Sequence, residues 1–123
     1  MKYDVSVSDN KRYIRIRVNE PVTADVLKGF ISETANKTKE YKVNKFLFDL
    51  RNSPNRTSPS IHYEFVYKRV EELGFVHGSK HAIIVKTEDI PDYHFVETIL
   101  DNAGFNGKIF TDERKAIEWI LEE

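Results

Sequence analysis

The sequence of 123 residues has no cysteine, and it contains only five glycines, four prolines, one methionine and one tryptophan. The absence of cysteine excludes disulfide bonds, thiolate nucleophiles and cysteine-ligated zinc. The glycines are scattered, so the chain has neither a Gly-x-Gly-x-x-Gly run nor a Gly-x-x-x-x-Gly-Lys loop for nucleotide phosphates. We therefore expect no dinucleotide and no other resident cofactor.

The sequence also lacks an excess of either charge and any long apolar run. Nineteen basic and twenty acidic residues leave a formal net charge of -1. A general nucleic-acid binder carries an excess of Lys and Arg on one face, so no nucleic-acid partner is expected. No apolar stretch is long enough to cross a bilayer, and the opening MKYDVSVSDNK lacks the apolar centre of a signal peptide. These features favour a cytoplasmic location without a membrane span.

What is present is the composition of a folded domain. Hydrophobic residues make up 40%, aromatic residues 12% and charged residues 32% of the chain, which is typical of globular proteins. No linker, low-complexity tract or internal repeat divides the sequence. We expect residues 1–123 to form a single domain.

The order of the expected elements indicates an α/β fold. Apolar and polar residues alternate in residues 3–7 and 14–18, and Asp9-Asn10 between them favours a turn, so this pair predicts an antiparallel hairpin. Helical spacing of apolar residues and short apolar runs then alternate along the chain. Helices are expected in residues 23–35 (with 36–40 fraying), 58–74, 90–104 and 111–121, and strands in residues 46–48, 81–86 and 108–110.

This β-β-α-β-α-β-α-β-α order predicts a mixed sheet of about five strands packed with four helices. Strict alternation of strand and helix favours right-handed crossovers and parallel pairing, so the sheet beyond the hairpin is expected to be mostly parallel. In such folds, binding sites gather beyond the carboxyl ends of the central strands. Residues 46–61, FLFDLRNSPNRTSPSI, supply a central strand, a polar loop and a helix that begins at Ser58-Pro59.

Several short strings resemble the SpoIIAA-like or STAS-like families over essentially the whole chain. They are FDLR at residues 48–51, Phe95 with Glu97, NAGFNGKIF at residues 102–110 and DERKAIEWIL at residues 112–121. The resemblance implies the SpoIIAA-like fold. It also implies a regulatory protein that docks a partner, because anti-sigma-factor antagonists of the STAS group bind a partner kinase or anti-sigma protein.

The same resemblance implies one candidate for regulation. Those antagonists are switched by phosphorylation of a serine in an Asp-Ser-Ser-Gly-like motif at a helix start, and residues 57–60, Thr-Ser-Pro-Ser, stand in its place. Ser58 alone matches the phosphorylated serine, and a phosphate at a helix amino end meets unpaired N–H groups. Arg51, Arg56 and Ser60 are the expected phosphate or partner contacts. The alternative is that Ser58 is a helix cap in a solvated loop.

The helix after this loop offers a second candidate surface. His62, Tyr63 and Tyr67 are expected on its exposed side, since the two tyrosines lie four residues apart and away from the apolar stripe. Exposed aromatic residues mark interfaces, so these residues are candidates for contact with a protein partner or with a second copy of the chain. Alternatively, they line a crevice for an apolar or lipid-like ligand between the second and third helices. A third reading is that the tyrosines close the edge of the core.

An enzymatic role is the least supported interpretation. Ser58, His62 and Asp49 supply the residue types of a nucleophile, a base and an acid, but no glycine-flanked nucleophile elbow accompanies them. His94 and Glu97 share one helix face, with Asp101 a turn further, and such a group is more often surface charge than a metal site. We therefore predict no catalytic residue and no metal site. The sequence predicts a non-enzymatic regulatory or protein-interaction domain.

Overall fold

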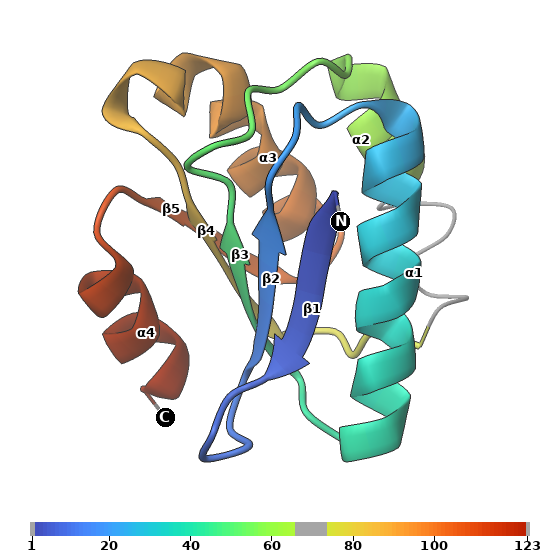
Figure 1. Cartoon of the computed structure of the whole chain (residues 1–123), viewed down its shortest axis with the longest axis vertical. Coiled ribbons are helices and arrows are strands. Elements are labelled where there is room, and N and C mark those ends of the chain that lie inside the picture. Colours follow the sequence, from blue (N-terminus) through green and yellow to red (C-terminus); the bar gives the residue numbers. More distant parts are fainter. Residues whose placement is uncertain (1, 66–73, 123) are drawn as a thin grey trace.

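A five-stranded sheet separates two unequal layers of helices in the computed structural model (Figure 1). The structure describes residues 2–65 and 74–122. The strands lie side by side in chain order, with β1 and β2 antiparallel and all later neighbours parallel. The strands are β1 (Tyr3–Val7), β2 (Ile14–Val18), β3 (Lys45–Asp49), β4 (Lys80–Ile84) and β5 (Asn106–Phe110).

The chain order of the strands explains where the helices lie. When parallel strands follow one another across a sheet, right-handed crossovers place every connecting helix on the same face. Three helices accordingly cover one face, and the last helix covers the other (Figure 1). The predicted fold class and element order are confirmed. The helices are α1 (Ala24–Tyr41), α2 (Pro59–Glu64), α3 (Ile90–Asn102) and α4 (Glu113–Leu121).

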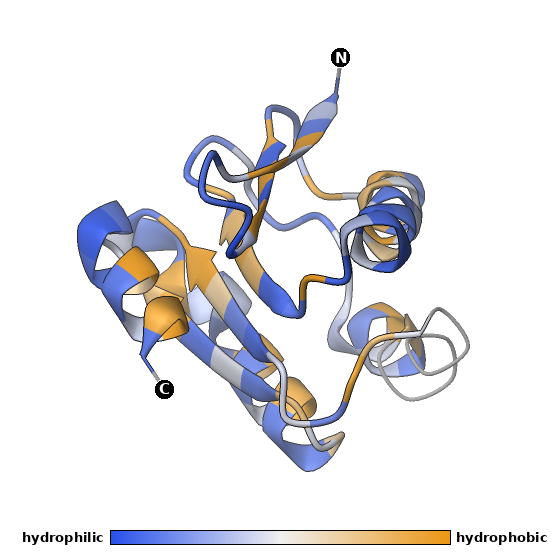
Figure 2. Cartoon of the chain, turned by 90° about the horizontal axis from the view of Figure 1, so that it is seen from below, coloured by the Kyte–Doolittle hydropathy of each residue, from blue (hydrophilic) through white to orange (hydrophobic). Residues whose placement is uncertain are grey.

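The central strands are buried on both faces. Along β3, Phe46 and Phe48 join the larger core under α1 to α3, whereas Leu47 joins the smaller core under α4. β4 divides in the same way, with Ile83 in the larger core and Ile84 in the smaller one. Figure 2 shows the apolar segments along the strands and on the helix sides that face them. The continuous apolar runs therefore indicated two-sided burial correctly.

Helix α1 begins where the sequence predicts and ends later. The Thr23 hydroxyl accepts a hydrogen bond from the backbone N–H of Val26 at 3.3 Å and so caps the helix. The expected fraying of residues 36–40 is wrong, because the helix continues to Tyr41. The buried Thr38 hydroxyl donates to the carbonyl of the residue four positions earlier at 2.9 Å. Lys42, the residue that follows the helix, has a left-handed φ of 56°.

Helix α2 begins as predicted, although its cap differs. Ser58 occupies the cap position before Pro59, but its hydroxyl makes no capping bond and lies 2.9 Å from the Ser60 hydroxyl instead. The described part of the helix ends at Glu64. The remainder of the expected helix, residues 66–73 with Tyr67, lies outside the described residues. Gly74, its expected end, has a left-handed φ of 90°.

Candidate functional site

The polar loop after β3 is fixed to the scaffold on both sides. The Ser53 hydroxyl donates to the carbonyl of Val18 at 2.7 Å, and the Tyr93 hydroxyl of α3 donates to the carbonyl of Ser53 at 2.5 Å. Further along, the backbone N–H of Arg56 donates to the carbonyl of Val22 at 2.8 Å. These bonds tie the loop to β2, to the segment before α1 and to α3. The predicted site loop therefore presents its side chains from a defined backbone.

Asp49, at the end of β3, anchors a charged cluster. Its carboxylate is 5% exposed and accepts two hydrogen bonds from the Arg51 guanidinium, at 2.9 and 2.8 Å. Arg17 of β2 approaches the same carboxylate at 3.5 Å. Burial alone raises the pKa of Asp49, but the hydrogen bonds and charge of Arg51, with the charge of Arg17, outweigh burial and lower it. Asp49 is therefore held as a carboxylate between arginines.

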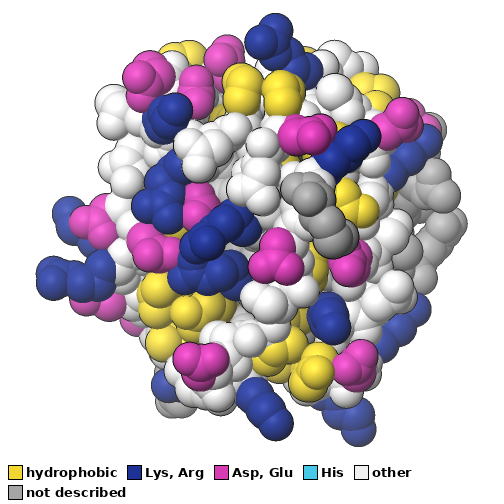
Figure 3. Space-filling view, viewed as in Figure 1, with side chains coloured by type: hydrophobic (Ala, Val, Ile, Leu, Met, Phe, Trp, Pro, Cys, Tyr) yellow, Lys and Arg dark blue, Asp and Glu magenta, His cyan; other side chains and the backbone are white. Residues whose placement is uncertain are grey.

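The cluster continues toward α4 and carries a surplus of positive charge. Glu113 lies 2.6 Å from Arg15 and 3.8 Å from Arg51. Three guanidinium groups thus share two carboxylates. Figure 3 shows Lys and Arg side chains gathered between α4 and the β1–β2 hairpin, with acidic side chains among them. The predicted contact residue Arg51 is partly exposed but already paired.

The structure leaves the other predicted loop residues at the surface. Ser58, Ser60 and Arg56 are all exposed. The mutual hydrogen bond of the two serine hydroxyls leaves them accessible to solvent. Phosphorylation of Ser58 and partner contact by Arg56 and Ser60 stay predictions.

The partner-contact prediction assumed that His62 lies on an exposed helix face, but the structure places it in the core. Its side chain is buried, at 8% exposure, and it packs edge-to-face against Phe95 with ring centroids 5.1 Å apart. Burial lowers the pKa of His62 to about 4, so its imidazole is neutral at pH 7. The neighbouring Tyr63 faces outward, at 52% exposure. Tyr67 lies outside the described residues, and its prediction is untested.

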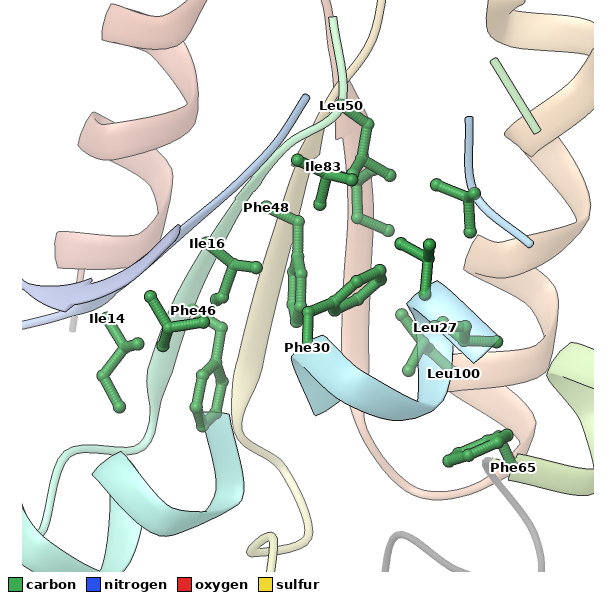
Figure 4. Close-up of a cluster of buried hydrophobic side chains, with 14 of the residues drawn as sticks. Ile14, Ile16, Leu27, Phe30, Phe46, Phe48, Leu50, Phe65, Ile83 and Leu100 are labelled. Carbon is green, nitrogen blue, oxygen red and sulfur yellow. The ribbon is translucent and has the colours of Figure 1, made fainter. Parts of the chain in front are cut away.

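A cavity of about 80 Å³ lies in the larger core, between the sheet and helices α1 to α3. Leu27 and Phe30 of α1, Phe48 and Ile83 of the sheet and Leu100 of α3 converge on this region (Figure 4). Protein interiors normally contain few voids larger than one water molecule. The cavity is nevertheless smaller than the roughly 300–1,000 Å³ of drug-sized sites, so it fits a small molecule or the end of a longer one.

Three of the thirteen lining residues carry polar side-chain atoms, and two of them bond to the scaffold. Tyr93 donates to Ser53, and Nε2 of His81 lies 2.9 Å from the Ser79 hydroxyl. Burial lowers the pKa of His81 to about 3, so this imidazole is also neutral. Within residues 2–65 and 74–122, Nε2 of His62 is buried without a hydrogen-bond partner. The surface that lines the cavity is therefore almost entirely apolar.

The residues considered for a metal have structural partners instead. A carboxylate oxygen of Glu97 accepts the backbone N–H of Ile109 at 2.9 Å, and Asp101 accepts that of Gly107 at 3.2 Å. Both bonds brace α3 against β5. His94 is exposed and lies 3.8 Å from Glu97. Among the residues that the structure describes, no three His, Asp or Glu side chains are grouped to hold a metal ion.

A solved structure with the same arrangement of layers identifies the fold. It is an uncharacterized protein of the DUF3478 family, with a SpoIIAA-like fold, from Shewanella loihica PV-4. The two chains align with a TM-score of 0.61 and 16% sequence identity, over 97% of this chain and 92% of that chain. This chain therefore has a SpoIIAA-like α/β fold, as the sequence resemblance predicted. At such low identity, the likeness establishes the fold and not the function.

Sequence comparison adds nothing to this result. No protein-family sequence model matches the chain, and no curated protein does. The described part of the chain contains no helix with the length and apolar character needed to span a membrane.

Proposed function

We propose that this protein is a binding module for a small apolar ligand, held in the cavity between the sheet and helices α1 to α3. The observation that carries the proposal is the cavity itself, which is lined by apolar side chains from the sheet and the surrounding helices. Filling such a void with apolar atoms restores dispersion contacts that its walls otherwise lack. A ligand with apolar surface would therefore stabilise the folded state by an amount that rises with its free concentration.

Binding rather than catalysis is the role that the side-chain chemistry favours. Asp49 is held by Arg51 and Arg17, on the side of the sheet that faces α4. His62 lies in the larger core, on the opposite side, and packs against Phe95. An acid–base relay needs these groups within hydrogen-bond distance of each other. We propose that neither residue is catalytic.

Native mass spectrometry on protein gently purified from its host tests the ligand proposal. We expect a non-covalent mass adduct that is lost on denaturation. Val96→Phe places extra atoms at the cavity wall and should remove the adduct. Ile117→Phe makes the same type of change on α4 and should retain it. A bare protein, or an adduct that both variants retain, would contradict the proposal.

Contact with a protein partner is the second candidate function, and the arginine cluster at the ends of β2 and β3 favours it. Arg17 is about half exposed, and the cluster has one more guanidinium than carboxylates. An acidic surface would complement this surplus, and such attraction weakens as salt increases. With Ser58 exposed nearby in sequence, a phosphate there would change the charge of the same loop.

Capture from host extract at low salt tests the partner candidate. We expect Arg17→Glu to lose the captured protein, whereas Arg114→Glu, an equal charge change on the exposed side of α4, should keep it. Equal capture by both variants would count against a docking role for the cluster. The native mass spectra described above also test regulation. Phosphorylation of Ser58 would appear as an increase in mass that phosphatase treatment removes.

A further inference from the structure

We infer that a pocket at the end of the sheet where β3 and β4 begin binds a small anion with two or more phosphate groups. The pocket has a volume of about 400 Å³, within the roughly 300–1,000 Å³ of small-molecule sites. It lies where the turn of the β1–β2 hairpin, the end of α1 and the starts of β3 and β4 come together (Figure 1). This basic pocket is separate from the apolar cavity, and the inference does not depend on the cavity ligand.

The basic pocket concentrates positive charge in a protein that has no overall excess of it. Five of the nine described residues that line it are Lys or Arg, and none of the nine is Asp or Glu. The whole chain has a formal net charge of -1, so the positive charge is local. A concave surface lined by one sign of charge raises the local concentration of the opposite ion. The five cations come from three separate segments of the chain: Lys11 and Arg12, Lys42 and Lys45, and Lys80.

Local structure accounts for two of the five cations. The Lys80 ammonium donates hydrogen bonds to the carbonyls of Trp119 and Glu122, at 2.8 and 3.0 Å, and so holds the end of α4. Lys42 directly follows α1, and the negative end of a helix dipole favours a cation there. These two residues have a role in the scaffold whether or not an anion binds.

The other three cations have no such role. Within residues 2–65 and 74–122, the side chains of Lys11, Arg12 and Lys45 form no ion pair and no hydrogen bond. The acidic residues Asp9 and Glu40 are close in sequence but do not line the pocket. Like charges around one pocket repel each other. A bound anion would relieve this repulsion and gain attraction from each cation.

The number and type of the cations indicate the chemical class of the anion. A phosphate group carries about -1.5 to -2 charges at pH 7, so the three cations without a partner already exceed what one phosphate neutralises. Four of the five cations are lysines, and lysine binds phosphate as a compact point charge with three donors. A small molecule with two or more phosphate groups therefore matches both the charge and the size of the basic pocket.

Titration calorimetry of the full chain with phosphate, pyrophosphate and tripolyphosphate at pH 7 tests the inference. These probes share one chemistry and differ in charge. We expect affinity to rise along the series, by about tenfold or more from phosphate to tripolyphosphate, as one added ion pair to a charged group would give. Because the cations are near the surface, the affinity for tripolyphosphate should fall as salt increases. Equal affinity for the three probes, or no binding of any, would overturn the inference.

Two matched variants locate the binding energy. Arg12→Glu reverses one cation of the basic pocket and should weaken tripolyphosphate about tenfold or more, whereas Arg12→Lys keeps the charge and should retain most of the affinity. Lys28→Glu makes the same type of charge reversal at an exposed residue near the other end of α1 and should weaken binding less than about twofold. Equal losses in Arg12→Glu and Lys28→Glu would mean that only net charge matters, which would overturn the site.

NMR of the unaltered protein keeps the question decidable if Arg12→Glu fails to fold. Tripolyphosphate should shift the backbone N–H signals of Asn44, Gly78 and Ser79, which line the basic pocket. Shifts confined to residues around Arg17 and Arg51 would place the anion at the arginine cluster and overturn the inference. A hexa-aspartate peptide or vesicles of phosphatidylglycerol serve as the acidic-peptide and lipid alternatives. Tighter binding of either one than of tripolyphosphate would overturn the small phosphate ligand.

Discussion

His62 and His81 place two neutral imidazoles in a layer made mainly of apolar side chains. His81 stacks on Phe46, with ring centroids 4.7 Å apart, and both histidines keep a lowered pKa because burial penalises the charged ring. In the unfolded chain a histidine has a pKa near 6.5. The folded protein therefore releases protons that the unfolded chain retains, which makes its stability depend on pH.

The expected result is a loss of stability as pH falls from about 6.5 toward 4. Above 6.5 both states are neutral at these histidines, and below it only the unfolded chain takes up the protons. Each histidine contributes a slope that approaches about 1.4 kcal/mol per pH unit. His62→Phe should lower the slope by about that amount between pH 6 and 4.5, as measured by urea unfolding.

His94→Phe is the control for this experiment, because it removes a histidine from the surface. An unchanged slope in His62→Phe would mean that the imidazole is accessible to water in the folded state. That outcome would also weaken the cavity as a dry site.

Asp49→Asn should destabilise the protein by about 1–3 kcal/mol. The change removes a buried charge that accepts two hydrogen bonds from Arg51. Because Arg17 and Arg51 are partly exposed, solvent screens their attraction to Asp49, and this reduces the expected loss of stability. Arg114→Ala breaks the exposed pair with Glu118 and should change the free energy of unfolding by less than about 0.5 kcal/mol. Equal effects of the two variants in urea unfolding would argue that Asp49 contributes no more than a surface charge.

Single residues were the least predictable from the sequence. Histidine occurs both at protein surfaces and in protein cores, so the sequence could not indicate that His62 turns inward and Tyr63 outward. Tyr93 was not among the residues expected to face the core, because a tyrosine so near a helix start resembles a surface residue. Its spacing to Val96 and Leu100 was the available signal. The Ser58 position was predictable from Pro59, but the direction of its hydroxyl was not.

At the scale of elements, the buried hydroxyl of Tyr93 is one of the groups that join α3 to the loop after β3. Tyr93→Phe removes the bond from this hydroxyl to the Ser53 carbonyl and should cost about 1–2 kcal/mol, because the carbonyl is left without that donor. Tyr41→Phe, on an exposed tyrosine at the end of α1, should cost less than about 0.5 kcal/mol. Thermal unfolding of both variants tests this, and an equal cost would contradict the anchoring role of Tyr93.

The elements themselves followed largely from local chemistry. The alternation of apolar and polar residues, with turn residues between the two runs, located both strands of the hairpin. Apolar runs located the buried strands, and capping residues located helix starts. The end of α1 escaped prediction because its last turns are polar in sequence. Their threonines are nevertheless buried, and they bond back to the preceding turn. Tertiary burial there outweighs the weak local helix preference of threonine.

At the scale of the whole molecule, strand order and crossover handedness distribute the helices unequally over the two faces of the sheet. Three helices on one face make the larger core, and one short helix makes the smaller one. This asymmetry was implied by the alternation of elements, and the fold could be predicted. The cavity could not, because it depends on how individual side chains fill the space under α1 to α3. Sequence patterns record which residues face inward but not how closely they fit.

The most direct test of the account is to locate a bound probe by NMR, using nuclear Overhauser effects from 1-butanol to assigned methyl groups. The account predicts contacts to Leu27, Ile83 and Leu100, which line the cavity. It predicts none to Leu47 and Ile84, which lie in the other core. Ile83 and Ile84 are neighbours on opposite faces of one strand, so they form an internal control. Contacts to Ile84 without Ile83, or contacts to neither, would contradict the account.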